Sequence, residues 1–115
     1  MRAILTYHSI DESGSPISVS PSAFRAHVRW LASGAVRVLP LDELVKADDR
    51  MDAVAITFDD GFENFATECA DLLVEHALPT TVFVVPEHVG RTNEWGGAAS
   101  PGIPTLPLMS WPTLR

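Results

Sequence analysis

The residues with the clearest chemical potential are two adjacent carboxylates, Asp59 and Asp60, which are followed by Gly61. They come directly after an apolar run at 53–58, AVAITF, that is typical of a buried strand. In α/β folds, ligands bind where such strands end. Two neighbouring carboxylates repel each other, so one tends to hold its proton unless a cation is near. A divalent metal would remove this conflict, with one aspartate as its ligand and the other as a base that accepts a proton from water.

A tight turn and a phosphatase site are the two alternatives for this pair. Asp-Gly is a common hairpin signal, but the residues after Gly61 follow the spacing of a helix rather than the alternation of a strand. Phosphatases of the haloacid dehalogenase type also carry a nucleophilic aspartate after a buried strand. Their pattern needs one residue between the two aspartates, whereas Asp59 and Asp60 are adjacent. A functional pair is therefore favoured over a plain turn, and the phosphatase spacing fails.

His8 is the histidine best placed to join the aspartates. It follows an expected strand at 3–7, and it shares the rim of Asp59 and Asp60 if that strand runs parallel to 53–58. A hydrogen-bonded loop histidine is an equally good interpretation of His8. Structural roles are favoured for the other histidines, His27, His76 and His88. No His-x3-His pair occurs, so the sequence does not define a complete metal site.

Trp95 and Trp111 are the aromatic residues expected to be most exposed. Trp95 lies in a glycine-rich segment at 90–107, where its indole ring could stack on a sugar ring. The alternative is that Trp95 pins this loop onto the domain, and ordinary tryptophan packing favours that role. Cys69 falls in an apolar helical stripe, so we expect a core side chain rather than a reactive thiol.

Apolar periodicity divides the chain into alternating strands and helices. Ser20 is a good helix cap before Pro21, and Phe24, Val28 and Leu31 follow at helical spacing. We predict strands near 3–7, 36–39, 53–58 and 80–85, helices near 21–33 and 63–76, a short helix at 41–47, a long loop over 90–107 and a new helix from Trp111. Such alternation predicts an α/β fold with a parallel sheet or barrel.

Composition narrows the class of protein and of partner. The 115 residues suffice for one small domain, and 46% hydrophobic with 20% charged residues is an ordinary globular balance. The net charge of -7 disfavours nucleic acid and anionic lipid as partners. We expect a soluble chain, because no apolar stretch is long enough for a membrane span or a signal peptide. A single cysteine cannot form an internal disulfide, so the cysteine content does not indicate the cellular compartment.

Several segments together resemble the polysaccharide deacetylases, which carry the NodB homology domain and form carbohydrate esterase family 4. The segment Ile56-Thr57-Phe58-Asp59-Asp60-Gly61 resembles the first motif of that family. Weaker matches lie at 5–8 (LTYH), 80–84 (TTVFV), 90–95 and 109–115. The resemblance implies a distorted (β/α) barrel of about twice this length, since such barrels commonly have ~250 residues. It also implies that residues 1–115 are the N-terminal part of that domain and end before its second motif.

The same resemblance implies a function. Asp59 would be the general base and Asp60 a ligand of a divalent metal, with zinc the expected ion. The other two ligands would come from a His-x3-His motif beyond Arg115. We also assign His8 and Trp95 to the substrate side of the site. The implied reaction is hydrolysis of N-acetyl groups on an amino-sugar polymer or a related non-peptide C–N substrate.

A non-catalytic truncated fragment or interaction module is the rival hypothesis. The coding sequence beyond Arg115 discriminates between the two, because an in-frame His-x3-His motif would indicate an enzyme. A barrel that ends midway also leaves the strand at 80–85 as an unpaired apolar edge. Such edges associate with other chains, so we expect self-association of the fragment.

Overall fold

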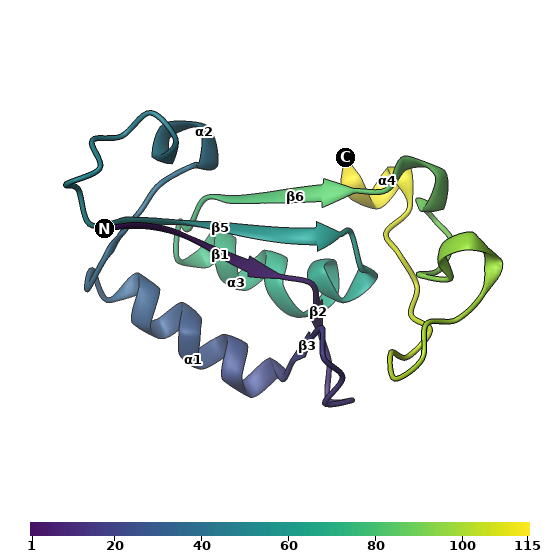
Figure 1. Cartoon of the computed structure of the whole chain (residues 1–115). Coiled ribbons are helices and arrows are strands. Elements are labelled where there is room, and N and C mark those ends of the chain that lie inside the picture. Colours follow the sequence, from purple (N-terminus) through teal and green to yellow (C-terminus); the bar gives the residue numbers. More distant parts are fainter.

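Strand β5, Ala53–Asp60, lies at the centre of a parallel sheet in the computed structural model, which describes residues 1–115 (Figure 1). Strand β1, Arg2–Tyr7, pairs with β5 along one edge. Strands β4, Arg37–Val38, and β6, Thr80–Val84, share the other edge, where β4 pairs with the beginning of β5 and β6 with its end. All pairs are parallel, which confirms the predicted class of fold.

The remaining elements confirm the predicted alternation and add one short ladder. They are β2 (Ser9–Ile10), β3 (Ser18–Val19), α1 (Pro21–Ala32), α2 (Leu41–Leu44), the π-helical turn η1 (Phe65–Cys69), α3 (Ala70–Glu75), the 3-10 turns η2 (Pro86–His88) and η3 (Trp95–Gly97), and α4 (Trp111–Leu114). Strands β2 and β3 form a separate parallel pair at the two ends of the expected polar loop.

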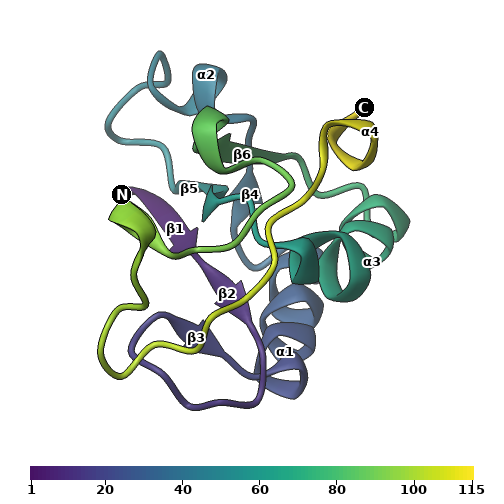
Figure 2. The same cartoon turned by 90° about the vertical axis from the view of Figure 1, so that its right-hand side faces the viewer.

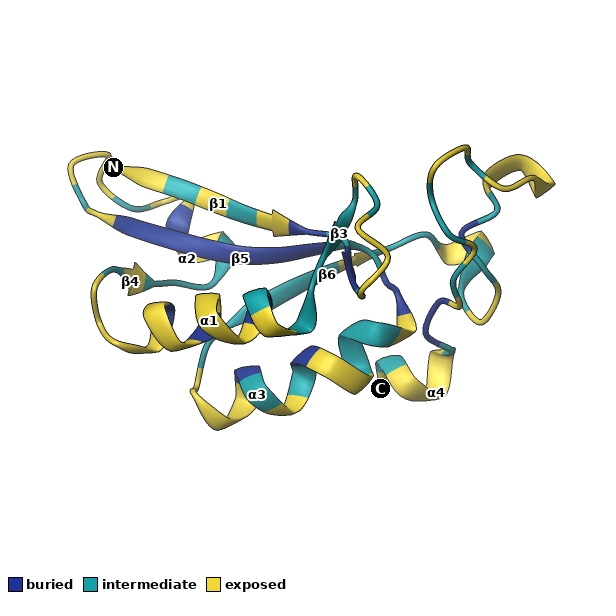
Figure 3. Ribbon diagram, turned by 90° about the horizontal axis from the view of Figure 1, so that it is seen from below, coloured by how far each residue is buried: buried dark blue, intermediate teal, exposed yellow.

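The core forms because β5 is apolar on both faces. Its side chains Val54, Ile56 and Phe58 pack in the main core cluster, which also includes buried residues of α1 and α3. Ala53 and Ala55 face the other way and pack on Leu44 of α2, in a second cluster. Figure 3 shows the result as a continuously buried β5 beneath a partly exposed β1. A strand covered on both faces is the arrangement expected of a parallel sheet flanked by helices.

Helix α1 follows directly from its sequence signals. The Ser20 hydroxyl accepts a hydrogen bond from the Ala23 N–H at 3.2 Å, and Pro21 occupies the first turn. The residues buried by this helix are the three at helical spacing, Phe24, Val28 and Leu31. Gly34 follows the end of the helix with φ +82°, a conformation that glycine adopts without steric cost. This part of the prediction is confirmed.

Three elements differ from the predicted boundaries. The short helix expected at 41–47 ends at Leu44. The strand expected at 36–39 is only two residues long, because Pro40 has no N–H to continue the ladder and β6 occupies the same edge of β5 further along. The helix expected at 63–76 is not one regular helix. It begins with the π-helical turn η1 and becomes α-helical only from Ala70. Such turns are frequent at functional sites, and this one lies beside the aspartates.

The glycine-rich segment at 90–107 crosses the carboxyl ends of the strands. Figure 2 looks onto those ends and shows the segment passing in front of them toward α4. The buried Asn93 side chain holds the crossing together, because it accepts from the Leu106 N–H at 2.7 Å and donates to the Pro104 carbonyl at 3.0 Å. The segment contains only the short turn η3, in agreement with the predicted loop. None of the helices is long and apolar enough to span a membrane.

Candidate active site

The register of β1 on β5 brings His8 to Asp59. Tyr7 pairs with Phe58 at the end of the β1–β5 ladder. The residues that follow them, His8 and Asp59, therefore lie at the same level of the sheet. The His8 Nε2 atom lies 3.6 Å from the Asp59 Oδ2 atom, an ion pair when the imidazole is protonated. The two side chains retain 35% and 39% of their exposure, so solvent and substrate can reach them. The predicted common rim of His8 and the aspartates is confirmed.

The turn after Asp59 has an unusual backbone. Asp60 has φ +76° and Gly61 φ +72°. A residue other than glycine rarely adopts this left-handed region, and such strain persists where the surrounding structure enforces it. A Cβ atom on Gly61 would lie 3.1 Å from Val84 Cγ1, so the position also lacks room for a side chain. The Asp-Asp-Gly sequence thus turns the chain sharply at the end of β5 rather than in a β-hairpin.

Segment 107–109 encloses this turn from the other side. The Met109 N–H donates to the Gly61 carbonyl at 2.8 Å, and the Glu63 N–H donates to the Pro107 carbonyl at 3.0 Å. Phe62 and Leu108 form an antiparallel bridge between these two bonds, and both side chains are buried. The strained turn is therefore held by segments from distant parts of the chain, which explains how it keeps its conformation.

The environment of Asp60 disfavours its charged form. Burial raises the pKa of the Asp60 carboxyl, the nearby His8 lowers it, and the Asp59 charge raises it again, with a net shift upward. An adjacent cation would reverse this balance. Asp60 therefore has the chemistry of a carboxylate that gains from a metal ion nearby.

The described residues supply part of a metal site. Within residues 1–115 no three His, Cys, Asp or Glu side chains gather closely enough to hold a metal ion. Carboxylate and imidazole are suitable donors for a divalent cation, so His8, Asp59 and Asp60 fit in chemical type, but they do not converge into a three-ligand site. Cys69 does not contribute, because it is buried in the core and burial raises the pKa of its thiol to about 12.

Trp95 lies on the crossing segment. Its ring packs edge-on against the His88 imidazole, with 4.8 Å between ring centroids, and the residue stays 37% exposed. The His88 Nδ1 atom lies 3.2 Å from the Thr92 carbonyl oxygen. One edge of Trp95 is thus fixed by the loop, and part of the side chain remains free to meet a ligand.

The other histidines make contacts that suit structural roles. The His27 Nδ1 atom lies 2.8 Å from the Tyr7 hydroxyl oxygen, which links α1 to β1. His76 is the exposed residue that ends α3. Neither of these side chains joins the His8–Asp59 pair.

One residue beside the site had no distinguishing sequence signal. Asn64 starts the π-helical turn, and its amide bonds across to residues 9 and 10 rather than within its own turn. An asparagine at the start of a helix normally indicates a cap, so the sequence alone favours a local role. The Asp-Asp-Gly motif locates the turn, but it does not show that the Asn64 side chain contacts the segment after His8.

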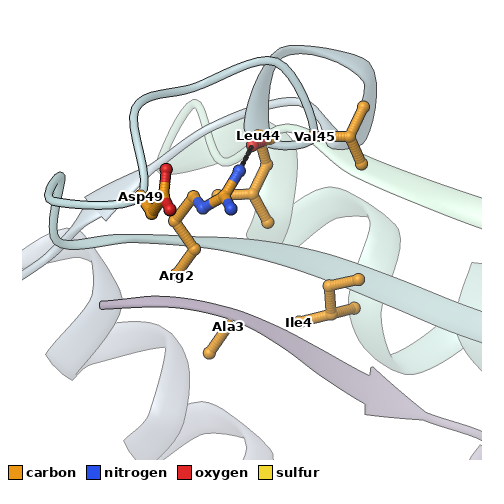
Figure 4. A pocket seen from close by; sticks show the side chains of 6 residues that line it. All are labelled: Arg2, Ala3, Ile4, Leu44, Val45 and Asp49. Carbon is orange, nitrogen blue, oxygen red and sulfur yellow. Dashed lines mark hydrogen bonds between the residues drawn. The ribbon is translucent and has the colours of Figure 1, made fainter.

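The largest cavity of the chain lies away from this site. It has a volume of about 690 Å³ and is lined by Arg2, Ala3, Ile4, Leu44, Val45 and Asp49 (Figure 4). These residues belong to the amino end of β1 and to the region of α2, where Arg2 donates to the Leu44 carbonyl at 3.4 Å. The cavity is thus at the end of the strands opposite to His8 and Asp59, and its size does not indicate catalysis.

Two known proteins are similar to this chain in sequence. A putative polysaccharide deacetylase of Bacillus subtilis, YxkH, is 32% identical over 95 residues, which is 78% of this chain and 34% of the relative. A poly-beta-1,6-N-acetyl-D-glucosamine N-deacetylase of Staphylococcus aureus is 32% identical over 80 residues, which is 66% of this chain and 28% of the relative. The chain therefore spans about a third of the length of these relatives.

A solved structure shares this fold. The structure of IcaB from Ammonifex degensii superposes with a TM-score of 0.77 at 23% identity, covering 98% of this chain and 46% of the other. At this identity the likeness shows the fold and not the activity. The family model for polysaccharide deacetylase matches residues 46–105, more than half of the chain, including β5 and the Asp-Asp-Gly turn. This chain belongs to the polysaccharide deacetylase family.

Proposed function

We propose that residues 1–115 form the N-terminal part of a deacetylase domain, and that the complete domain is a metal-dependent hydrolase. Its reaction would be the removal of N-acetyl groups from an amino-sugar polymer. The observation that carries the proposal is the pairing of His8 with Asp59 beside the strained Asp60, at the carboxyl end of the central strand. A titratable pair in this position of an α/β sheet is typical of an active site.

Asp59 acts as the general base in this proposal. Its carboxylate is accessible and faces the His8 imidazole. It accepts the proton of the attacking water as the water adds to the acetyl carbonyl carbon. Because His8 lies within 3.6 Å, its imidazole orients the carboxylate and contributes a hydrogen-bonding group on the substrate side. Nearby backbone N–H groups would help to hold the oxygen on which negative charge develops.

Asp60 is the proposed metal ligand of this chain. Its partly buried carboxyl benefits from a cation, and it lies one residue from the base. A bound divalent ion, with zinc the expected one, would polarise the acetyl carbonyl and lower the pKa of water. A catalytic zinc usually has about three protein ligands, so the remaining donors must come from outside residues 1–115.

The substrate class follows from the relatives and from the exposed Trp95. The staphylococcal relative is a deacetylase of poly-beta-1,6-N-acetyl-D-glucosamine. An aromatic ring on a loop across the strand ends suits the apolar face of a sugar. The net charge of -7 is compatible with a neutral polymer that becomes cationic on deacetylation. Other acylated amines with non-peptide C–N bonds share the same chemistry.

Acetate release by the protein expressed from its complete coding sequence tests the proposal. The substrates are oligomers of β-1,6-linked and β-1,4-linked N-acetylglucosamine, with an acetylated peptide as the comparison. We expect release from at least one sugar oligomer, loss after chelation and recovery with zinc. No release from any sugar, with an intact fold by circular dichroism, would support the non-catalytic alternative. Release from the peptide alone would move the substrate class away from carbohydrates.

A further inference from the structure

We propose that Asn64 is a positioning residue that sets the spacing between His8 and the aspartates. The inference rests on the proposed function, because it concerns the geometry of the same site. Asn64 makes no contact with substrate in this proposal. It acts through the two chain segments that carry His8 on one side and Asp59 with Asp60 on the other.

Both polar atoms of the Asn64 side-chain amide form hydrogen bonds with the segment after His8. Its Oδ1 atom accepts from the Ile10 N–H at 3.1 Å, and its Nδ2 atom donates to the Ser9 hydroxyl at 2.8 Å. Ser9 is completely buried, with 0% exposure. A buried pair of this kind is costly to break, because the group left behind loses both its partner and water. The two bonds therefore fix the segment next to His8 relative to the segment next to Asp60.

Asn64 does not cap the helical turn that it precedes, although asparagine commonly does so at this position. Asn64 begins η1 with helical backbone angles, φ -64° and ψ -17°, but its side chain makes no capping hydrogen bond. Its amide is instead directed at β2, and β2 packs against η1. A local helix-stabilising role thus does not explain the side chain, whereas a connection between the two loops does.

The connection continues into the loop beyond Ser9. The Ser9 hydroxyl donates to the Asp11 carboxylate, which also accepts from the Ser18 hydroxyl at 2.8 Å and the Ser13 N–H at 2.7 Å. Since the Ser9 proton is committed to Asp11, the Ser9 oxygen is left to accept from Asn64. The network therefore specifies an amide at position 64, which offers a donor to Ser9 and an acceptor to Ile10.

The need for this connection follows from where the β1–β5 ladder stops. Tyr7 and Phe58 are its last paired residues, and His8 and Asp59 come directly after them. Beyond that level, the hydrogen bonds of Asn64 join the two segments on this side of the sheet. Without them the segment after His8 keeps its bonds to residues 17–19, including Ser9 N–H to the Ile17 carbonyl at 3.2 Å, and the core packing of Ile10. The distance from His8 to Asp59 would then be restrained less tightly.

Enzyme kinetics on the protein expressed from its complete coding sequence test the proposal. Asn64→Ala should lower kcat by about 100-fold with KM within a factor of about two, because a misplacement of ~1 Å costs about that much in rate. Asn64→Asp should recover part of the loss, since its carboxylate still accepts from Ile10. Thr67→Ala, an exposed residue of the same turn, is the matched surface control. Val28→Ala, in α1, is the control for a general loss of stability.

Two outcomes would overturn the proposal. One is a kcat for Asn64→Ala no lower than that of Val28→Ala at an equal drop in Tm. The other is a loss that appears only in KM. Backbone amide chemical shifts of the wild type and the variants test the positioning role without an activity assay. Asn64→Ala should shift the His8 and Asp59 amides, and Thr67→Ala should not. If the wild type is inactive, the proposed function fails. Independently of activity, Asn64→Ala shifts confined to residues 9–11 and 63–65 would refute the positioning role.

Discussion

The Nε2 atom of His8 lies 3.6 Å from the Oδ2 atom of Asp59, although His8 follows β1 and Asp59 belongs to β5. The contact exists because β1 and β5 are parallel and their ladder ends at Tyr7 and Phe58, the residues just before His8 and Asp59. It places an imidazole beside one of two adjacent carboxylates, so the two aspartates have different surroundings. Asp59 faces His8 from an accessible position, whereas Asp60 lies in a strained and partly buried turn.

Substitution of each aspartate should separate their roles in the complete protein. We expect Asp60→Ala to lose bound metal and activity together. Asp59→Asn should keep its metal and lower turnover by about 10²–10⁴-fold, the usual contribution of a general base. Metal content by atomic emission and acetate release are measured on the same samples. Equal metal loss in both variants would refute this division of roles.

Trp95 should matter for substrate affinity more than for the chemical step. Trp95→Ala is expected to raise KM by about fivefold with little change in kcat, because a lost stacking contact is worth roughly 1 kcal/mol. Trp111→Ala is the matched control, since Trp111 is also an exposed tryptophan but lies on α4. If both variants behave alike, or if Trp95→Ala only lowers Tm, then Trp95 pins the loop and does not bind sugar.

Asp11 should make the stability of the fold depend on acid pH. Burial raises the pKa of Asp11, but hydrogen bonds from Ser13, Ser9 and Ser18 outweigh it and lower the pKa from 3.8. Stabilisation by the carboxylate is therefore complete above the unfolded value of 3.8 and is lost as the pH falls through the lower folded value.

The variant Asp11→Asn tests this dependence. It should cost about 1 kcal/mol of unfolding free energy at pH 7, and the difference from wild type should shrink as the pH is lowered to about 2. Urea unfolding across this pH range measures it. Asp71→Asn, at an exposed site on α3, should show no such trend. A difference that grows on acidification would contradict the role of the hydrogen-bonded carboxylate.

Gly61 should be the glycine least tolerant of substitution. Both Gly61 and Gly34 have positive φ, but only at Gly61 does an added Cβ meet a neighbour, Val84 Cγ1 at 3.1 Å. Gly34→Ala should cost about 1 kcal/mol from backbone strain alone. Gly61→Ala should cost about 3 kcal/mol, because the steric conflict adds to the strain. Thermal unfolding of both variants gives the comparison, and equal costs would show that Val84 moves aside.

The 115-residue chain alone should bind zinc weakly, self-associate and release no acetate. Within it no three metal-binding side chains lie close enough together to hold a metal ion. Strands β1 and β6 are both at the edge of the sheet, and Phe83 of β6 is 50% exposed. Exposed apolar edges favour association. Calorimetry with zinc and sizing chromatography test this, with Phe83→Lys expected to reduce the association. A monomer with submicromolar zinc affinity that deacetylates chitooligosaccharide would disprove the prediction.

Local patterns were sufficient to predict most of the helices and strands of this fold. The run AVAITF predicted β5, and the Ser-Pro start with its three spaced apolar residues predicted α1, because burial and capping depend on neighbours in the chain. The family resemblance was likewise carried by one contiguous motif and its flanking strands, and the match over residues 46–105 confirms it. The common rim of His8 and the aspartates needed only the further assumption that the strands are parallel, which is correct.

Tertiary structure alone decided how these parts are held in place. The division of one β5 edge between β4 and β6 depends on where the folded chain places the two strands, and no local pattern encodes that. Segment 107–109, distant in sequence, holds the turn in which Asp60 has its positive φ. The bonds of Asn64 to Ser9 and Ile10 likewise join residues distant in sequence. Contacts of this kind arise from close packing of separate segments, so their partners become visible only once the chain is folded.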